Sequence, residues 1–162
     1  MARALRFMGL AALAFMVASC SQQSTPAPTT EQGIFAIEAQ DAAPGGEAQV
    51  RVRSLPTSGT VVTVVSQLTY DSSRLKVKDC AIGTGGTVGK QLQWAEPQQG
   101  MVTAVVAGGL EPLPQESELL HCSFTVVPGT SGSASLSIHG GVADKPYEER
   151  EFSAQGAVII GN

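Results

Sequence analysis

The fold of this 162-residue chain is decided by the stretch TVVTVVSQLTYDSSRLKV, residues 60–77. Its first part, residues 60–70, is a long run rich in β-branched residues, and its last part alternates Leu75 and Val77 with lysines. Both patterns are typical of β-strands. We expect the chain to turn between the two strands at Asp71, because an Asp side chain can accept hydrogen bonds from amides two and three residues further on.

The same two-residue period continues through the rest of the chain after residue 33, and no window of eleven or more residues shows a helical stripe. Clusters of glycine and proline, such as Gly140-Gly141, separate the alternating segments. The expected strands cover residues 34–39, 49–53, 60–70, 74–80, 90–95, 101–107, 119–127, 133–139 and 152–160. This spacing predicts an all-β domain that folds as a two-sheet sandwich of about nine strands.

Several segments of the chain resemble those of cohesin domains. Residues 68–77 resemble the hallmark segment, in which a strand ends in an apolar residue, Tyr and Asp and the next strand opens with Leu. Residues 119–126 are similar to the penultimate core strand of that family. Residues 129–138 are similar to its glycine-containing turn followed by Ser-Leu-Ser, and residues 156–159 to its closing Gly-Val strand.

The resemblance extends over residues 33–162 and implies a nine-stranded jelly-roll β-sandwich, related in shape to carbohydrate-binding modules. It assigns Tyr70 and Asp71 to a structural turn. The function that it implies is binding of a protein partner, a dockerin-like calcium-binding module on another exported protein. The chain itself has no Asp-rich calcium loop, so it could only be the receptor of such a pair.

The N-terminal segment predicts export. Arg3 and Arg6 precede an uncharged run, residues 7–17, which is too short to span a bilayer core of about 30 Å. Small residues then lead directly into Cys20, an arrangement that resembles the lipobox of bacterial lipoproteins. The resemblance implies cleavage after residue 19 and acylation of Cys20, with the outer membrane or cell surface favoured over the inner membrane. The alternative is a plain secretory signal with an incidental cysteine.

The expected organisation is therefore a signal peptide (residues 1–19), an acylated cysteine with a flexible tether (20–32) and one folded domain (33–162). The tether is rich in Ser, Gln, Thr and Pro and has no large apolar residue. Removal of the signal, with two arginines, changes the formal net charge from −4 to −6. This charge argues against nucleic acid as a partner.

Two cysteines remain once Cys20 is acylated. Cys80 and Cys122 form an even pair in an oxidising compartment, so we expect a disulfide between them. It would close a loop of about 43 residues and contribute roughly 4 kcal/mol by the chain-entropy estimate. The alternative is a pair of buried free thiols that act as small apolar residues.

No residue pattern predicts catalysis, a metal site or a cofactor. His121 and His139 are expected to be strand residues at a sheet edge, without a nucleophile elbow or metal-ligand spacing. Residues 148–151, with three glutamates, are expected to form a solvated loop because adjacent strand residues cannot act as a carboxylate pair. The glycine-rich segment 83–90 fails the spacing of a phosphate loop and is expected to be a hairpin loop.

Three classes of function remain, and all describe a non-enzymatic protein of unknown oligomeric state. The first is a lipid-anchored module that binds a protein. The second is polysaccharide binding, which needs exposed aromatic rings. The phenylalanines are expected to face the core, which leaves Trp94 and Tyr147 as candidates, and Trp94 shares a face with Leu92 that favours burial. The third is a structural envelope lipoprotein without a dedicated ligand. We favour the first class.

Overall fold

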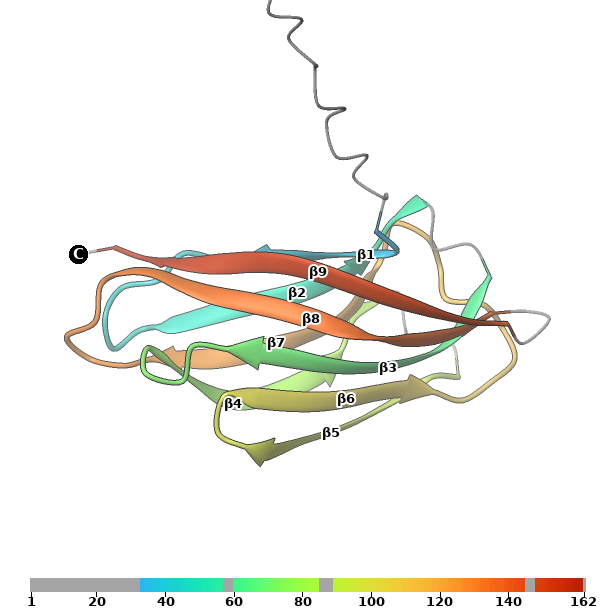
Figure 1. The fold of residues 1–162 in the computed structure, drawn as a ribbon, viewed down its shortest axis with the longest axis horizontal. Helices are drawn as coiled ribbons and strands as arrows, with labels where there is room; N and C mark the ends of the chain where they lie inside the picture. Colours follow the sequence, from blue (N-terminus) through green and yellow to red (C-terminus); the bar gives the residue numbers. More distant parts are fainter. Residues whose placement is uncertain (1–32, 57–59, 85–88, 145–147, 162) are drawn as a thin grey trace, which may run out of the picture.

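The computed structural model describes residues 33–56, 60–84, 89–144 and 148–161. These residues form nine strands in two sheets that face each other (Figure 1). The strands are β1 (Phe35–Ala39), β2 (Glu47–Ser54), β3 (Val61–Tyr70), β4 (Leu75–Ile82), β5 (Gln91–Gln98), β6 (Met101–Ala107), β7 (Glu118–Val126), β8 (Gly132–Asp144) and β9 (Glu149–Ile160). The predicted all-β sandwich is confirmed.

The four-stranded sheet has the order β1-β2-β7-β4, and the five-stranded sheet has the order β5-β6-β3-β8-β9. All pairs of neighbouring strands are antiparallel. Figure 1 looks onto the five-stranded sheet, from β9 at the top to β5 at the bottom. Along one side of the sandwich β1 lies against β9, and a parallel bridge joins Ala42 to Ile160. β4 and β5 are the edge strands of the opposite side.

Alternation along the strands fills the space between the sheets with apolar side chains. In β2, for example, Val50 and Val52 are fully buried, whereas the arginines that follow them face outward. The three phenylalanines Phe35, Phe124 and Phe152 are all buried, as the alternation predicts. The rings of Phe35 and Phe152 meet edge to face with centroids 4.7 Å apart, which connects β1 to β9 through the core.

The predicted disulfide is present. Cys80 on β4 and Cys122 on β7 are direct register partners, their side chains are buried, and a disulfide joins them. It therefore links an edge strand to an inner strand of the four-stranded sheet.

β4 and β5 each contain an irregularity in their pairing. The register of β4 shifts between Val77 and Asp79, and that of β5 shifts between Ala95 and Gln98, around Pro97. An inserted residue bends and twists a strand locally, and proline has no amide hydrogen to donate. The outer edges of these strands are therefore uneven.

The prediction that Gly140-Gly141 breaks the chain is wrong. β8 runs through both glycines to Asp144, paired with β3 on one side and β9 on the other. A Cβ atom on Gly140 would lie only 2.0 Å from the carbonyl oxygen of Val65, so the close approach of β3 requires a glycine at this position. β9 likewise begins at Glu149, so most of the expected charged loop belongs to a strand.

Two further expectations are corrected by the topology. β4 and β5 belong to different sheets, so the connection between them is a crossover and not a hairpin, although residues 85–88 of the segment 83–90 lie outside the described residues. Glycine-rich composition does not distinguish a hairpin from such a crossover. His121 and His139 are strand residues, but their strands, β7 and β8, lie inside the sheets and not at an edge.

Candidate functional site

The outer face of the four-stranded sheet is covered by ion pairs. The pairs are Arg51 with Glu118 at 3.5 Å, Arg53 with Glu38 at 3.2 Å and Lys78 with Glu47 at 3.1 Å. His121 adds a contact of 2.8 Å between its Nδ1 and an oxygen of Glu118. Such exposed pairs contribute little to stability, but their charges are strongly hydrated. A partner that covered this face would have to displace that hydration.

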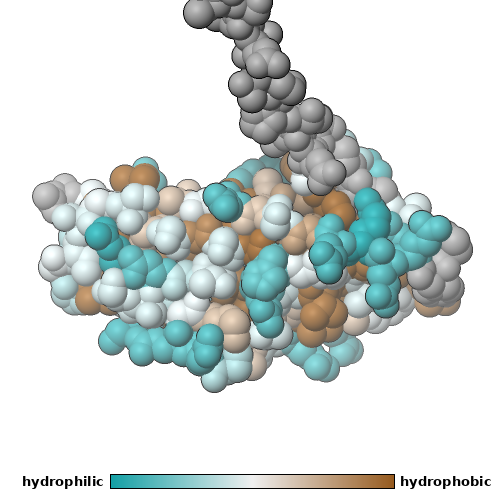
Figure 2. Space-filling model, viewed as in Figure 1, coloured by the Kyte–Doolittle hydropathy of each residue, from teal (hydrophilic) through white to brown (hydrophobic). Residues whose placement is uncertain are grey.

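The outer face of the five-stranded sheet has a different composition. Its central outward-facing residues are uncharged or small, namely Thr63, Val65, Gln67 and Thr69 on β3, Met101, Thr103 and Val105 on β6, and Ser135, Ser137, His139 and Gly141 on β8. Figure 2 shows pale and brown side chains over much of this face, with teal groups between and around them. Val65, in the middle of the central strand, is 48% exposed.

The charged residues of this face lie at one margin. Among the described residues, the outward-facing positions of its five strands carry two charged side chains, Glu149 and Glu151, and both are on β9. Burial of uncharged groups costs less desolvation free energy than burial of ion pairs. The face is therefore the better candidate for contact with a protein, and we call it the β3 face after its central strand.

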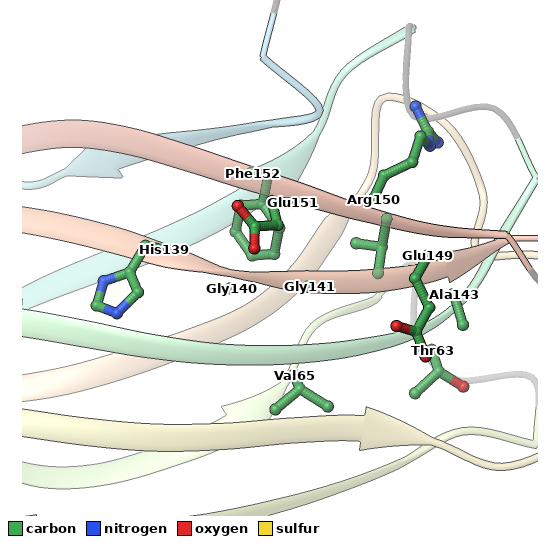
Figure 3. Close-up of a pocket in the computed structure, with 11 residues that line it drawn as sticks. Thr63, Val65, His139, Gly140, Gly141, Ala143, Glu149, Arg150, Glu151 and Phe152 are labelled. Atoms are coloured by element: carbon green, nitrogen blue, oxygen red, sulfur yellow. The ribbon is translucent and has the colours of Figure 1, made fainter.

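A hollow interrupts the β3 face where Gly140 and Gly141 lie. It has a volume of about 720 Å³, and its lining includes Val65, His139, Glu149, Glu151 and Phe152. Figure 3 shows these side chains, from β3, β8 and β9, around a stretch of backbone that has no side chains. Sequence reasoning missed this hollow because it interpreted the glycine pair as a turn.

Tyr70 and Asp71 lie at the end of β3, where the chain turns toward β4. The phenol of Tyr70 donates a hydrogen bond to the carboxylate of Glu96, and burial, followed by this hydrogen bond, raises the pKa of Tyr70. The Asp71 carboxylate accepts a hydrogen bond from the amide of Ser73 at 3.0 Å and pairs with Arg74 at 3.2 Å. The backbone carbonyl of Asp71 accepts the amide of Arg74, three residues on.

Of the two candidate aromatic residues, Trp94 lies in the part of the chain that the structure describes. Trp94 lies on the inner face of β5 with Leu92, half-buried and packed against the core. Tyr147 lies outside the described residues, as do Cys20 and the predicted signal and tether, residues 1–32.

A buried lysine fixes the start of β5. Lys90 is 8% exposed, and its Nζ donates hydrogen bonds to the carbonyl oxygens of Val62 at 2.8 Å and Gly109 at 3.2 Å. These two hydrogen bonds attach the end of the β4–β5 connection to β3 and to the residues that follow β6.

The described residues contain no group of three His, Cys, Asp or Glu side chains that could hold a metal ion. His121 and His139 face outward from different sheets. No helix long and apolar enough to cross a membrane occurs among the same residues.

Comparison with known proteins identifies relatives by structure alone. No family model matches the sequence, and no curated protein matches it. A non-cellulosomal cohesin from the archaeon Archaeoglobus fulgidus matches with a TM-score of 0.66 and 16% identity, over 79% of this chain and 90% of that one. A cohesin module from a family 33 glycoside hydrolase of Clostridium perfringens matches with a TM-score of 0.65 and 14% identity, over 80% and 98%.

A type I cohesin–dockerin complex from Clostridium thermocellum also matches, with a TM-score of 0.61 and 18% identity, over 78% of this chain and 99% of that one. At these identities the similarity shows the fold. The chain has the sandwich architecture of cohesin modules.

Proposed function

We propose that this protein is a non-enzymatic binding module that presents the β3 face to a protein partner. The observation that carries the proposal is the difference between the two outer faces of the sandwich. One is covered by ion pairs, and the other exposes uncharged side chains around a half-exposed valine. A protein interface has few charged residues at its centre, which is the composition of the β3 face.

The dimensions of the β3 face suit a protein partner. Five strands spaced about 4.8 Å apart give a width of roughly 20 Å, and the ten residues of β3 give a length of roughly 30 Å. This area is of the same order as the roughly 800 Å² that each partner contributes to a standard protein–protein interface.

The partner that we propose is a dockerin-like module. The support is the cohesin architecture of the chain together with the Clostridium thermocellum neighbour, which was solved as a cohesin–dockerin complex. Because dockerin-like modules are expected to depend on bound calcium, the interaction should require it.

The test is a calcium-dependent capture experiment with two matched variants. Thr69 on β3 and Thr125 on β7 are both exposed threonines on inner strands, one on each outer face of the sandwich. Thr69→Arg should abolish capture of a specific protein from envelope extract, because it places an unpaired charge on the central strand of the β3 face, near the end of that strand. Thr125→Arg should leave capture unchanged. Loss of capture with Thr125→Arg but not with Thr69→Arg, or capture that survives chelation of calcium, would contradict the proposal.

We also propose that the module is held at a membrane by lipid on Cys20, with export to the outer membrane or cell surface. The supporting pattern is the charged, apolar and small-residue order of residues 3–20. A tether of the composition of residues 21–32, at about 3.1 Å per residue, would then allow the domain to lie roughly 30 Å from the bilayer. Metabolic labelling with radioactive palmitate should mark the wild-type protein and not Cys20→Ser. Equal labelling of both proteins, or of neither, would contradict lipidation at Cys20.

A further inference from the structure

We propose that the hollow over Gly140 and Gly141 binds a basic side chain of the protein partner, a lysine or an arginine. The inference rests on the proposed function, because it names the chemistry that one part of the β3 face recognises. The hollow lies at the β9 margin of that face, so a side chain that enters it would be anchored beside the uncharged centre.

The shape of the hollow follows from the register of three strands. Gly141 has Val65 of β3 and Glu151 of β9 as its direct partners, and it faces outward without a side chain between them. The next outward position along β8, Ala143, is also small. The result is a trough with an apolar side at Val65 and a carboxylate side at β9 (Figure 3). A long aliphatic stem with a charged end matches these two sides.

The charge of the hollow is not compensated within the protein. The backbones of Glu149 and Glu151 pair with β8, but their side-chain carboxylates form no hydrogen bond or ion pair with any residue that the structure describes, and both residues are exposed. Arg150, between them in sequence, also borders the hollow, but its side chain extends to the other side of β9 from Gly140 and Gly141 and pairs with Asp144 (Figure 3). The two carboxylates therefore present negative charge to a partner.

The opposite face provides the contrast. There Glu38, Glu47 and Glu118 are each paired with a lysine or arginine of the same protein. A partner that covers Glu149 and Glu151 without supplying a cation would leave two carboxylates desolvated and unpaired, which is unfavourable. The site should therefore favour basic side chains over neutral ones and reject acidic ones.

The direct test uses three blocked tripeptides as probes with the ¹⁵N-labelled protein. They are acetyl-glycyl-lysyl-glycinamide, the norleucine analogue with the same stem and no charge, and the glutamyl analogue. NMR titration should show shifts of the Gly140, Gly141 and Glu151 amides with the lysyl peptide, with a dissociation constant on the order of millimolar. The norleucine peptide should bind about three- to fivefold more weakly, and the glutamyl peptide should cause no shift at these amides.

Two site variants and one control separate charge from shape. Glu149→Gln with Glu151→Gln should reduce binding of the lysyl peptide about three- to fivefold or more, whereas Glu111→Gln, at an exposed glutamate in the β6–β7 connection, should not change it. Gly141→Leu should abolish the shifts by filling the hollow, since a Cβ atom at Gly141 meets nothing closer than 3.8 Å. Circular dichroism on each variant establishes that the fold is kept.

Three results would overturn the inference: equal binding of the lysyl and norleucine peptides, lysyl-induced shifts only outside the hollow, or unchanged binding in the double variant. Displacement of the peptide by equimolar CaCl₂ would also overturn it, by making the hollow a metal-ion site. The proposed function is tested separately. If Gly141→Leu still captures the partner, the hollow does not contribute to partner binding, and the β3 face remains the proposed binding surface. If the lysyl peptide binds but no partner is captured, the hollow remains a site for basic side chains and the proposed function is contradicted.

Discussion

Substitution of Gly140 by alanine should destabilise the protein far more than the same substitution one residue later. A Cβ atom on Gly140 would lie 2.0 Å from the carbonyl oxygen of Val65 and 2.8 Å from the Cα atom of Ser66. Both are backbone atoms of β3, the central strand of its sheet, so no side-chain rotation can relieve the overlap. β8 must instead move away from β3 by roughly 1 Å, which weakens the hydrogen bonds between them.

The cost combines two contributions. Overpacking of a well-filled site costs about 1–3 kcal/mol, and each ladder hydrogen bond that is weakened costs about 1 kcal/mol. We therefore expect Gly140→Ala to lower the free energy of unfolding by about 4 kcal/mol. Gly141→Ala has no such overlap, because its nearest neighbour would be the carbonyl oxygen of Arg150 at 3.8 Å. It should stabilise the protein by about 0.4–1 kcal/mol through the unfolded state.

Equilibrium unfolding in urea, followed by Trp94 fluorescence and far-ultraviolet circular dichroism, measures both variants. With a typical slope of about 2 kcal/mol per molar, Gly140→Ala should lower the urea midpoint by about 2 M. A loss below about 0.5 kcal/mol for Gly140→Ala, or equal losses for both variants, would refute the close packing of β3 and β8 described above.

Three further predictions concern groups inside the sandwich. Tyr70→Phe should lower the free energy of unfolding by about 1–2 kcal/mol at neutral pH, because it removes the hydrogen bond to a partly buried carboxylate. Because the pKa of Tyr70 is raised in the folded protein, the stability of the wild-type protein should fall as the pH rises above 10. The fall should be smaller in Tyr70→Phe. Identical pH profiles of stability would contradict the raised pKa of Tyr70. Replacement of Cys80 and Cys122 by alanine removes a crosslink that spans 42 positions and should lower the free energy of unfolding, measured in urea, by about 4 kcal/mol. A loss below about 1 kcal/mol would contradict a stabilising role of the disulfide. Lys90→Met should lower the thermal midpoint, because it leaves the buried carbonyl group of Val62 without this donor, at a cost of about 1–3 kcal/mol. An unchanged midpoint would contradict that role.

Alternation along the chain predicted the strands well wherever one face of a strand is buried. β6 begins and ends at the predicted residues, and the buried phenylalanines follow from their positions in alternating segments. The pairing of Cys80 with Cys122 was predictable from the even number of cysteines that remain after Cys20. These features depend on local pattern or on simple counting.

The candidate site was not predictable in the same way, because it depends on which strands become neighbours. Gly140 and Gly141 carry the composition of a turn, and only the presence of β3 on one side and β9 on the other makes them part of a strand. One signal was available. Ile138 and Val142 keep the two-residue period on the inner face across the glycines, which a turn would have interrupted.

The uneven pairing of β4 and β5, the edge strands of one side of the sandwich, has a consequence for how copies of this protein behave when they are crowded together. An unpaired strand edge is a template for another chain, and exposed regular edges lead to aggregation. β4 carries a register shift beside Lys76 and Lys78, and β5 carries one at Pro97. Neither β4 nor β5 therefore offers a neighbouring molecule a regular ladder to extend, and this side of the sandwich disfavours polymerisation when the protein is at a high local density.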